Sequence, residues 1–154
     1  MGWFDFRLAY FPGEDALRKE KWEKARMHLE KALQINPAST EAACDLATAL
    51  WSLGKKEEAR KQINDFLQKF PQSLGFLTLG RFLSEENQLD AAHEAFQKAV
   101  SLDPKNLDAH YELGKVLLQL NEPEKVFEIF HKVTLNDPFI TPFALSRLQE
   151  KLRD

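Results

Sequence analysis

Residues 76–104, which read FLTLGRFLSEENQLDAAHEAFQKAVSLDP, carry the pattern that decides the fold. Small and apolar side chains recur there at intervals of three and four residues, which is the spacing of one face of an α-helix. Asn87 divides the stretch into two helices, because asparagine tolerates the left-handed conformation that ends a helix. Pro104 ends the second helix, because proline cannot continue one. The stretch therefore predicts a pair of helices joined by a short turn.

The same helix pair recurs along the chain with a nearly constant period of about 34 residues. Four prolines stand one period apart from each other: Pro37, Pro71, Pro104 and Pro138. The second helix of each pair keeps a small residue followed four positions later by a large apolar one: Ala25 and Leu29, Ala59 and Ile63, Ala92 and Phe96, and Val126 and Phe130. So many coincidences at one period predict a repeat protein, in which each unit buries its apolar face against its neighbours.

The first helix of each pair and its boundaries repeat as well. Leu46-Ala47, Leu79-Gly80 and Leu113-Gly114 stand in register. Turn residues that favour the left-handed conformation follow these dipeptides, and residues suited to capping the start of a helix precede them. The turn residues are Gly54, Asn87 and Asn121, and the candidate caps are Ser39 or Thr40, Ser73, Asn106 and Thr141.

These positions resemble the tetratricopeptide repeat, whose pattern runs Trp-x2-Leu-Gly-x2-Tyr, then Ala-x3-Phe, then Pro. Residues 76–104 fit it best, residues 110–138 follow with Val126 in place of alanine, and residues 43–71 fit more loosely. The resemblance implies an all-α, right-handed solenoid of antiparallel helix pairs. It also implies that the first helix of each pair lines a concave, ligand-binding side.

The front of the chain departs from the pattern. Residues 22–37 read as a second helix, but Pro12-Gly13 interrupts the helix that should precede it, and no glycine or asparagine marks a turn before Trp22. Two arrangements stay open: one long helix over residues 14–35, or a short helical stub followed by a normal second helix. The expected organisation is an aromatic segment at 1–13, an irregular leading repeat at 14–39, three full repeats at 40–140 and a capping helix at 141–154.

Composition is that of an ordinary globular chain. The 154 residues suffice for one compact domain, and a net charge of −3 argues against a dedicated nucleic-acid binder. Cys44 is the only cysteine, so no intramolecular disulfide can form. No apolar run is long enough to span a membrane, and Asp5 and Arg7 interrupt the apolar N-terminus in a way that secretory signals do not. We therefore expect a cytoplasmic protein.

The sequence offers no recognisable catalytic centre. The four histidines lack metal-ligand spacing, and no phosphate-binding loop or nucleophile motif occurs. Cys44 has acids beside it, which disfavour a reactive thiolate. His110 and His131 fall in the same repeat, and the simplest interpretation of both is helix packing. We expect no enzyme activity, no cofactor and no metal.

By analogy with the family, the outward positions of each first helix form the partner-binding face. Over the whole inner surface of these helices, acids outnumber bases by five (Glu41, Asp45, Glu85, Asp108 and Glu112) to two (Arg81 and Lys115). Several large apolar groups there have no obvious core role, so the sequence favours an amphipathic, basic peptide or helix as partner. An alternative is that the leucines only fill the seam between repeats. The positions are Trp51, Leu74, Leu77, Thr78, Arg81, Asp108, Tyr111, Glu112, Lys115 and Leu118.

One subtype of the family, which clamps the C-terminal carboxylate of heat-shock chaperones with lysine, arginine and asparagine, is not expected here. The matching positions are Cys44, Thr48, Thr78, Asp108 and Glu112, none of which is a cation.

The N-terminal aromatic residues are too apolar for a free tail. They either cap the exposed end of the first repeat or form a second interface with a partner or another copy of the chain. The partner-binding face predicts a protein-binding scaffold or adaptor, and two other functions remain open. The chain could be a self-assembling structural subunit that uses this segment, or a non-catalytic accessory domain of a larger complex. The candidate residues are Trp3, Phe4, Phe6, Tyr10 and Phe11.

Overall fold

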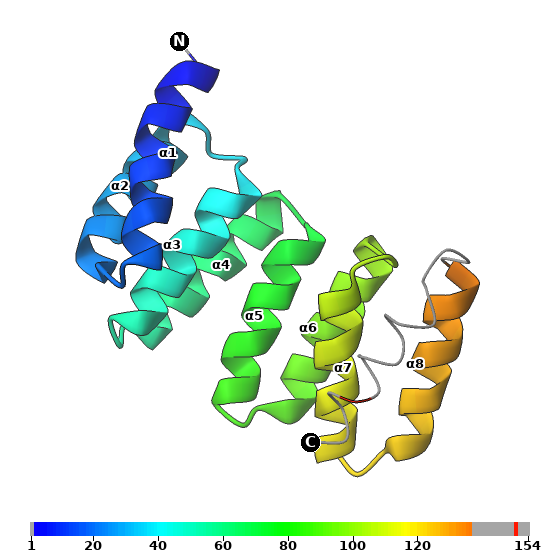
Figure 1. Cartoon of the computed structure of the whole chain (residues 1–154). Coiled ribbons are helices and arrows are strands. Elements are labelled where there is room, and N and C mark those ends of the chain that lie inside the picture. Colours follow the sequence, from blue (N-terminus) through cyan, green and yellow to red (C-terminus); the bar gives the residue numbers. More distant parts are fainter. Residues whose placement is uncertain (1, 137–149, 151–154) are drawn as a thin grey trace. The chain divides into compact units, whose positions relative to one another are not determined.

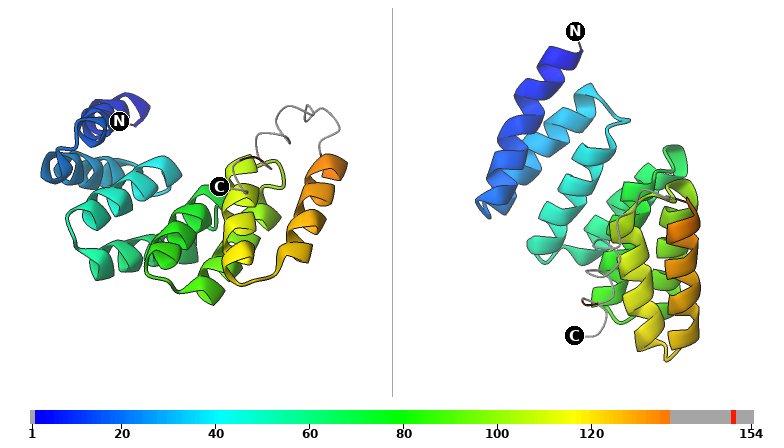
Figure 2. Two further views of the ribbon diagram at one scale, coloured as in Figure 1. Left: turned by 60° about the horizontal axis from the view of Figure 1, so that its bottom comes forward. Right: turned by 45° about the vertical axis from the view of Figure 1, so that its right-hand side comes forward.

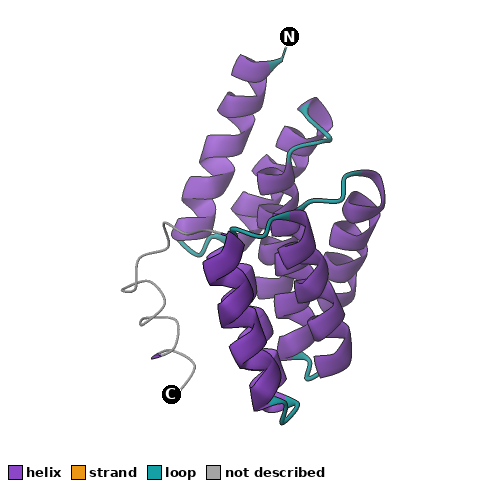
Figure 3. Ribbon diagram, turned by 90° about the vertical axis from the view of Figure 1, so that its right-hand side faces the viewer, coloured by secondary structure: helices purple, strands orange, loops and turns teal. Residues whose placement is uncertain are grey.

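A computed structural model describes residues 2–136 and residue 150. The described residues form α-helices joined by short turns, and no strand occurs among them (Figures 1 and 3). The predicted capping helix at 141–154 lies outside the described residues, apart from the single position 150. The helices are α1 (Trp3–Arg18), α2 (Trp22–Ile35), α3 (Thr40–Ser52), α4 (Lys56–Lys69), α5 (Ser73–Glu85), α6 (Leu89–Leu102), α7 (Leu107–Gln119) and α8 (Pro123–Asn136).

The chain divides into two compact units, residues 1–79 and residues 80–154, with the boundary inside α5. In the first unit α1 packs on α2, α2 on α3 and α3 on α4, so that helices adjacent in sequence lie side by side (Figures 1 and 2). In the second unit α6 packs on α7 and α7 on α8. Each unit is therefore a stack of helix pairs, as the period predicts.

In each of the four helix pairs, one residue in the left-handed conformation lies in the turn between the two helices. Glu20, Gly54, Asn87 and Asn121 have φ angles of 54°, 77°, 59° and 60°. The predicted turns at Gly54, Asn87 and Asn121 are confirmed. The turn at Glu20 was not predicted, because glutamate rarely adopts positive φ.

Predicted helix caps are confirmed at two sites. The Ser39 hydroxyl accepts a hydrogen bond from the backbone N–H of Ala42 at 3.3 Å, and the Asn106 side chain accepts one from the N–H of Ala109 at 3.0 Å. Each satisfies a donor that the first turn of a helix leaves without a partner. Ser73 is the first residue of α5, and Thr141 lies outside the described residues.

The core is built from the repeated small and large residues. The side chains of Leu29, Ile63 and Phe96 are fully buried. A Cβ added to Gly80 would lie 2.5 Å from Cε1 of Phe96, and one added to Gly13 would lie 2.9 Å from Cγ of Leu29. Glycine at both positions therefore lets the two helices of a pair approach closely.

The prediction that Pro12-Gly13 breaks the first helix is wrong. α1 runs through Pro12 as one helix of 16 residues, and α2 is a separate helix, so neither arrangement left open by the sequence is found. Proline removes the hydrogen bond to the carbonyl of Leu8, but Leu8 is exposed, so water can satisfy that carbonyl. Gly13 lies one period before Ala47 and contacts α2 as Gly80 contacts α6. The leading unit is therefore a regular helix pair, not an irregular one.

Candidate functional site

The predicted binding face is only partly accessible. Seven of its ten residues keep exposed or half-exposed side chains, and three are buried. Leu77, Thr78 and Glu112 have 2%, 8% and 9% of their surface exposed. The accessible residues are Trp51, Leu74, Arg81, Asp108, Tyr111, Lys115 and Leu118.

Thr78 faces the neighbouring first helix instead of solvent, and Leu77 beside it is buried as well. Thr78 donates its hydroxyl hydrogen to the carbonyl of Leu74 at 3.0 Å and also hydrogen-bonds Cys44 of α3. Cys44, one period earlier than Leu77, is buried as well. The register identified the right helix, but the Leu77 side chain is buried in the fold. The expectation that Leu77 offers an exposed apolar contact is therefore wrong.

Glu112 lies at the centre of an ion-pair network in the second unit. Its Oε1 atom lies 3.2 Å from Nε of Arg81, and its Oε2 atom lies 2.8 Å from Nζ of Lys115. Lys115 also lies over the ring of Tyr111, with Nζ 5.0 Å from the ring centroid. Because two cations neutralise this carboxylate, Glu112 does not contribute to the acidic rim that the sequence predicts.

The negative charge gathers in the first unit, where α1 meets α3. Tyr10 donates its hydroxyl hydrogen to Oδ2 of Asp45 at 2.9 Å. Burial raises the pKa of Asp45, the Tyr10 hydrogen bond opposes this, and the charges of Glu14 and Glu41 raise it further. Burial and the Asp45 charge likewise raise the pKa of Tyr10. No lysine or arginine among the described residues forms an ion pair with Glu14, Glu41 or Asp45, so a region of uncompensated negative potential results.

The N-terminal aromatic residues divide into two groups. Phe6 and Tyr10 stack with ring centroids 5.4 Å apart, and the Tyr10 hydroxyl reaches α3. Trp3, Phe4 and Phe11 are exposed on the outer side of α1. The five residues therefore do not all lie on one exposed side of α1.

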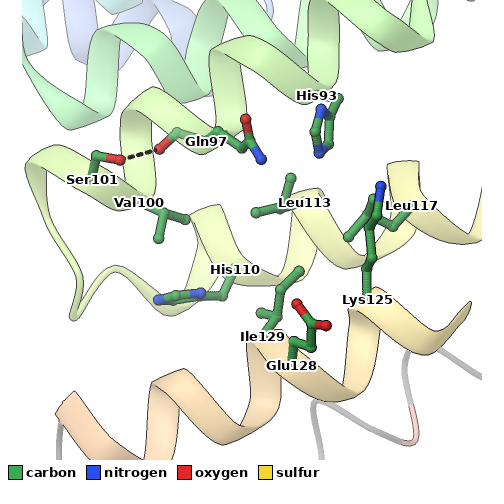
Figure 4. Close-up of a pocket in the computed structure, with 10 residues that line it drawn as sticks. All are labelled: His93, Gln97, Val100, Ser101, His110, Leu113, Leu117, Lys125, Glu128 and Ile129. Atoms are coloured by element: carbon green, nitrogen blue, oxygen red, sulfur yellow. Dashed lines mark hydrogen bonds between the residues drawn. The ribbon is translucent and has the colours of Figure 1, made fainter. Parts of the chain in front are cut away.

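A hollow of about 370 Å³ lies between α6, α7 and α8 in the second unit (Figure 4). Leu113 and Leu117 supply apolar walls, and His93 and Lys125 supply polar ones. His110 is buried; its Nε2 lies 2.9 Å from the carbonyl oxygen of Pro104, and its Nδ1 has no partner among the described residues. Burial lowers the pKa of His110, so the ring is neutral at neutral pH. This confirms the packing interpretation for His110.

The described residues contain no group of three or more histidine, cysteine, aspartate or glutamate side chains placed to hold a metal ion. Cys44 is buried, and burial is the main cause that raises the pKa of its thiol to about 11. A thiol of that pKa is almost wholly protonated near neutral pH and is therefore a poor nucleophile. Among the described residues, no helix is long and apolar enough to cross a membrane.

Comparison with known sequences identifies the repeat. The family described as "Tetratricopeptide repeat" matches residues 16–75, and the one described as "TPR repeat" matches residues 80–121. BBSome complex member BBS4 of Bos taurus is 28% identical over 108 residues, which cover 70% of this chain and 21% of that protein. Type IV pilus assembly protein PilF of Pseudomonas aeruginosa is 28% identical over 119 residues, or 75% of this chain and 47% of that protein. The chain thus spans between about a fifth and a half of these relatives.

Solved structures show the same fold. The structure of Pseudomonas aeruginosa PilF has a TM-score of 0.74 at 24% identity, over 97% of this chain and 69% of that one. MamA from Desulfovibrio magneticus RS-1 has a TM-score of 0.67 at 24% identity, over 84% and 74% of the two chains. The first repeat domain of Spaghetti (RPAP3), solved with an HSP90 peptide, has a TM-score of 0.66 at 19% identity, over 76% and 94%. With helix pairs, turns and core residues in register through four repeats, this chain belongs to the tetratricopeptide-repeat family.

Proposed function

We propose that this chain is a non-catalytic adaptor that binds a peptide or helix of a partner protein on the exposed side of its first helices. Tetratricopeptide repeats are protein-interaction modules, and one structural neighbour was solved with a bound peptide. In this architecture the first helix of each pair has positions that do not serve the core. Half-exposed Trp51 and exposed Leu74 and Leu118 supply apolar contacts at such positions.

The charge around Asp45 carries the proposal for the partner's chemistry. The charges of Glu14 and Glu41 raise the pKa of Asp45 and so add to the cost of ionising it, and no cation among the described residues forms an ion pair with any of the three. A lysine or arginine from a partner would lower that cost, because opposite charges across an interface stabilise each other. The site therefore favours a basic, amphipathic segment, with apolar residues that can reach Trp51.

A chaperone C-terminal carboxylate fits this face poorly. Because the leading unit is a complete helix pair, the clamp positions can be counted from either of two pairs. Counted from α3 they hold Cys44, Thr48, Thr78, Asp108 and Glu112, and counted from α1 they hold Tyr10, Glu14, Asp45, Leu74 and Thr78. Neither set contains the lysines and arginine that would grip a carboxylate.

Affinity capture from a native lysate tests the proposal. Wild-type protein is compared with the double variant Glu41→Lys/Trp51→Ala, which reverses one exposed charge and removes one aromatic contact. Glu94→Lys is the matched control, because Glu94 is an exposed acid on α6, a second helix. We expect partners held by wild type and by Glu94→Lys to be lost by the double variant, and circular dichroism to confirm that all three are folded. Equal retention by all three proteins would refute the proposal.

A further inference from the structure

The outer side of α1 presents an apolar surface that no described residue covers. Trp3, Phe4, Leu8 and Phe11 are 71%, 69%, 62% and 44% exposed. With Arg7 and Pro12 they line a hollow of about 410 Å³ on one face of the helix. Contiguous apolar surface of this kind marks an interaction site in a soluble protein.

Elsewhere in the fold the equivalent face of a first helix is covered by the preceding second helix. Leu8 is in register with Ala42, Gly75 and Ala109, which are all small and buried. At Gly75 the approach is so close that an added Cβ would lie 2.6 Å from Cδ2 of Leu67 in α4. Leucine at this position prevents an approach of that kind. The element that covers α1 therefore packs at a wider separation, with large side chains interdigitating in the hollow.

Two charged side chains on the same side of α1 lack partners of opposite charge. The Arg7 guanidinium lies over the rings of Trp3 and Phe11, with its Cζ 4.4 Å and 4.6 Å from the centroids, and forms no ion pair with the described residues. Glu14 is seven residues further on, which is two helical turns, so it projects from nearly the same side. It too has no cation partner among residues 2–136.

We propose that α1 packs antiparallel against α1 of a second copy of this chain, around a two-fold axis between Leu8 and Phe11. In that arrangement Leu8 of each copy enters the hollow beside Phe11 of the other, as knobs enter holes. The antiparallel direction brings Arg7 of each copy beside Glu14 of the other. The dimer therefore contains two equivalent Arg7–Glu14 ion pairs. A two-fold interface requires such self-complementarity.

The charge pattern favours a second copy over a lipid surface. Helix α1, residues 3–18, contains three acids, which are Asp5, Glu14 and Asp15, and two bases, which are Arg7 and Arg18. A helix of net charge −1 on a chain of net charge −3 is not drawn to an anionic membrane. The patch is small, and interfaces below about 1,200 Å² are typical of transient complexes, so the dimer is expected to form at micromolar to submillimolar concentration.

Sedimentation velocity tests this surface across a concentration series up to about 0.1 mM. A dimer with so small an interface should be populated at the upper end of that series. We expect wild type to dimerise reversibly. Arg7→Glu and Glu14→Arg should each raise the dimer Kd by about tenfold, because each places like charges across the axis. The double variant Arg7→Glu/Glu14→Arg should restore the wild-type Kd, and an equimolar mixture of the two single variants should form heterodimers. Lys31→Glu, an exposed charge reversal on α2, should change nothing.

Three results would overturn the proposal: wild type monomeric throughout the series, single variants that dimerise as well as wild type, or a double variant that is not rescued. Co-sedimentation of a monomeric wild type with phosphatidylcholine–phosphatidylglycerol vesicles, lost in Phe4→Ser/Leu8→Ser, would assign the face to lipid instead. Because Glu14 also belongs to the acidic region of the proposed binding face, Arg7→Glu separates the two surfaces: it should lose dimerisation and keep partner capture.

Discussion

Glu20 adopts a backbone conformation that ordinary side chains avoid, with a φ angle of 54°. The three other turns of this kind use Gly54, Asn87 and Asn121, which tolerate it. A non-glycine residue held in the left-handed region costs of the order of 1 kcal/mol. Glu20 thus carries local strain that the rest of the first helix pair offsets.

Replacing Glu20 by glycine should therefore stabilise the protein. We expect Glu20→Gly to raise the free energy of unfolding by about 0.5–1 kcal/mol, measured by urea denaturation, because relief of strain exceeds the added chain entropy. Glu20→Ala is the control: alanine meets the same steric penalty, so it should give no comparable gain. A glycine variant less stable than wild type would show that the side chain of Glu20 contributes more than its backbone costs.

Leu74 and Leu77 make a matched pair for locating the accessible side of α5. Leu77 is buried, whereas Leu74 is 39% exposed. Leu77→Glu forces a charge into the seam and should lower the free energy of unfolding by about 3 kcal/mol or more, as chemical denaturation would measure. Leu74→Glu should cost less than about 1 kcal/mol. Similar losses for both variants would contradict the assigned orientation of α5.

At the scale of the element, α1 is a helix that contains a proline. Pro12 lacks the N–H that would bond the carbonyl of Leu8, and an interior proline costs a helix up to about 3 kcal/mol. Pro12→Ala restores that bond and should stabilise the protein by about 1–2 kcal/mol in thermal or urea unfolding. Gly13→Ala should do the opposite, because its Cβ would lie 2.9 Å from Cγ of Leu29. Destabilisation by Pro12→Ala would mean that the ring makes contacts worth more than the lost bond.

The contact between α1 and α3 predicts a pH dependence. The pKa of Asp45 is raised in the folded protein, chiefly by burial, so the folded state holds its proton at a pH where the unfolded state has released it. Stability attributable to Asp45 is therefore present below its unfolded pKa and is lost as pH rises through the folded pKa. Asp45→Asn keeps a hydrogen-bond acceptor for Tyr10 and removes the charge. It should be more stable than wild type at neutral pH.

That advantage should shrink as the solution is acidified through the aspartate range, which unfolding curves at several pH values would measure. Glu94→Gln, at an exposed acid on α6, is the control and should show no such trend. An advantage of Asp45→Asn that stays constant with pH would contradict the assignment of the shift to burial and to neighbouring acids.

At the scale of the whole molecule, the repeat period was enough to predict the fold class. Small residues, prolines and turn residues in register all reflect how each helix pair buries its face, and the structure confirms those that fall within residues 2–136, whereas Pro138 lies outside the described residues. Gly13 stands one period before Ala47, so the register also indicates a complete leading helix pair. That pair was not predicted, because Pro12 indicates a break in its first helix. A rule about proline in isolation could not take into account that Leu8, whose carbonyl it frees, is an exposed residue.

The binding face was less predictable. The repeat register assigns each residue to a helix, but it does not show which side chains of neighbouring helices pack against that residue. Leu77 and Leu74 belong to the same helix, yet the fold buries the first and leaves the second exposed. Glu112 reads as an exposed acid in sequence, whereas Arg81, 31 residues away, neutralises it in the fold. The acidic region around Asp45 depends on Tyr10 and Glu14. Both lie on α1, a helix that Pro12-Gly13 was expected to interrupt.

Site-specific photo-crosslinking in a native lysate tests the adaptor claim most directly. A photoreactive residue replaces Glu41, which is exposed at the start of α3 beside the acidic region, or Glu94 on the outer side of α6 as the comparison. The account predicts a partner crosslinked from position 41 and not from position 94, through a segment rich in lysine or arginine and apolar residues. Equal crosslinking from both positions, or none from position 41, would contradict it.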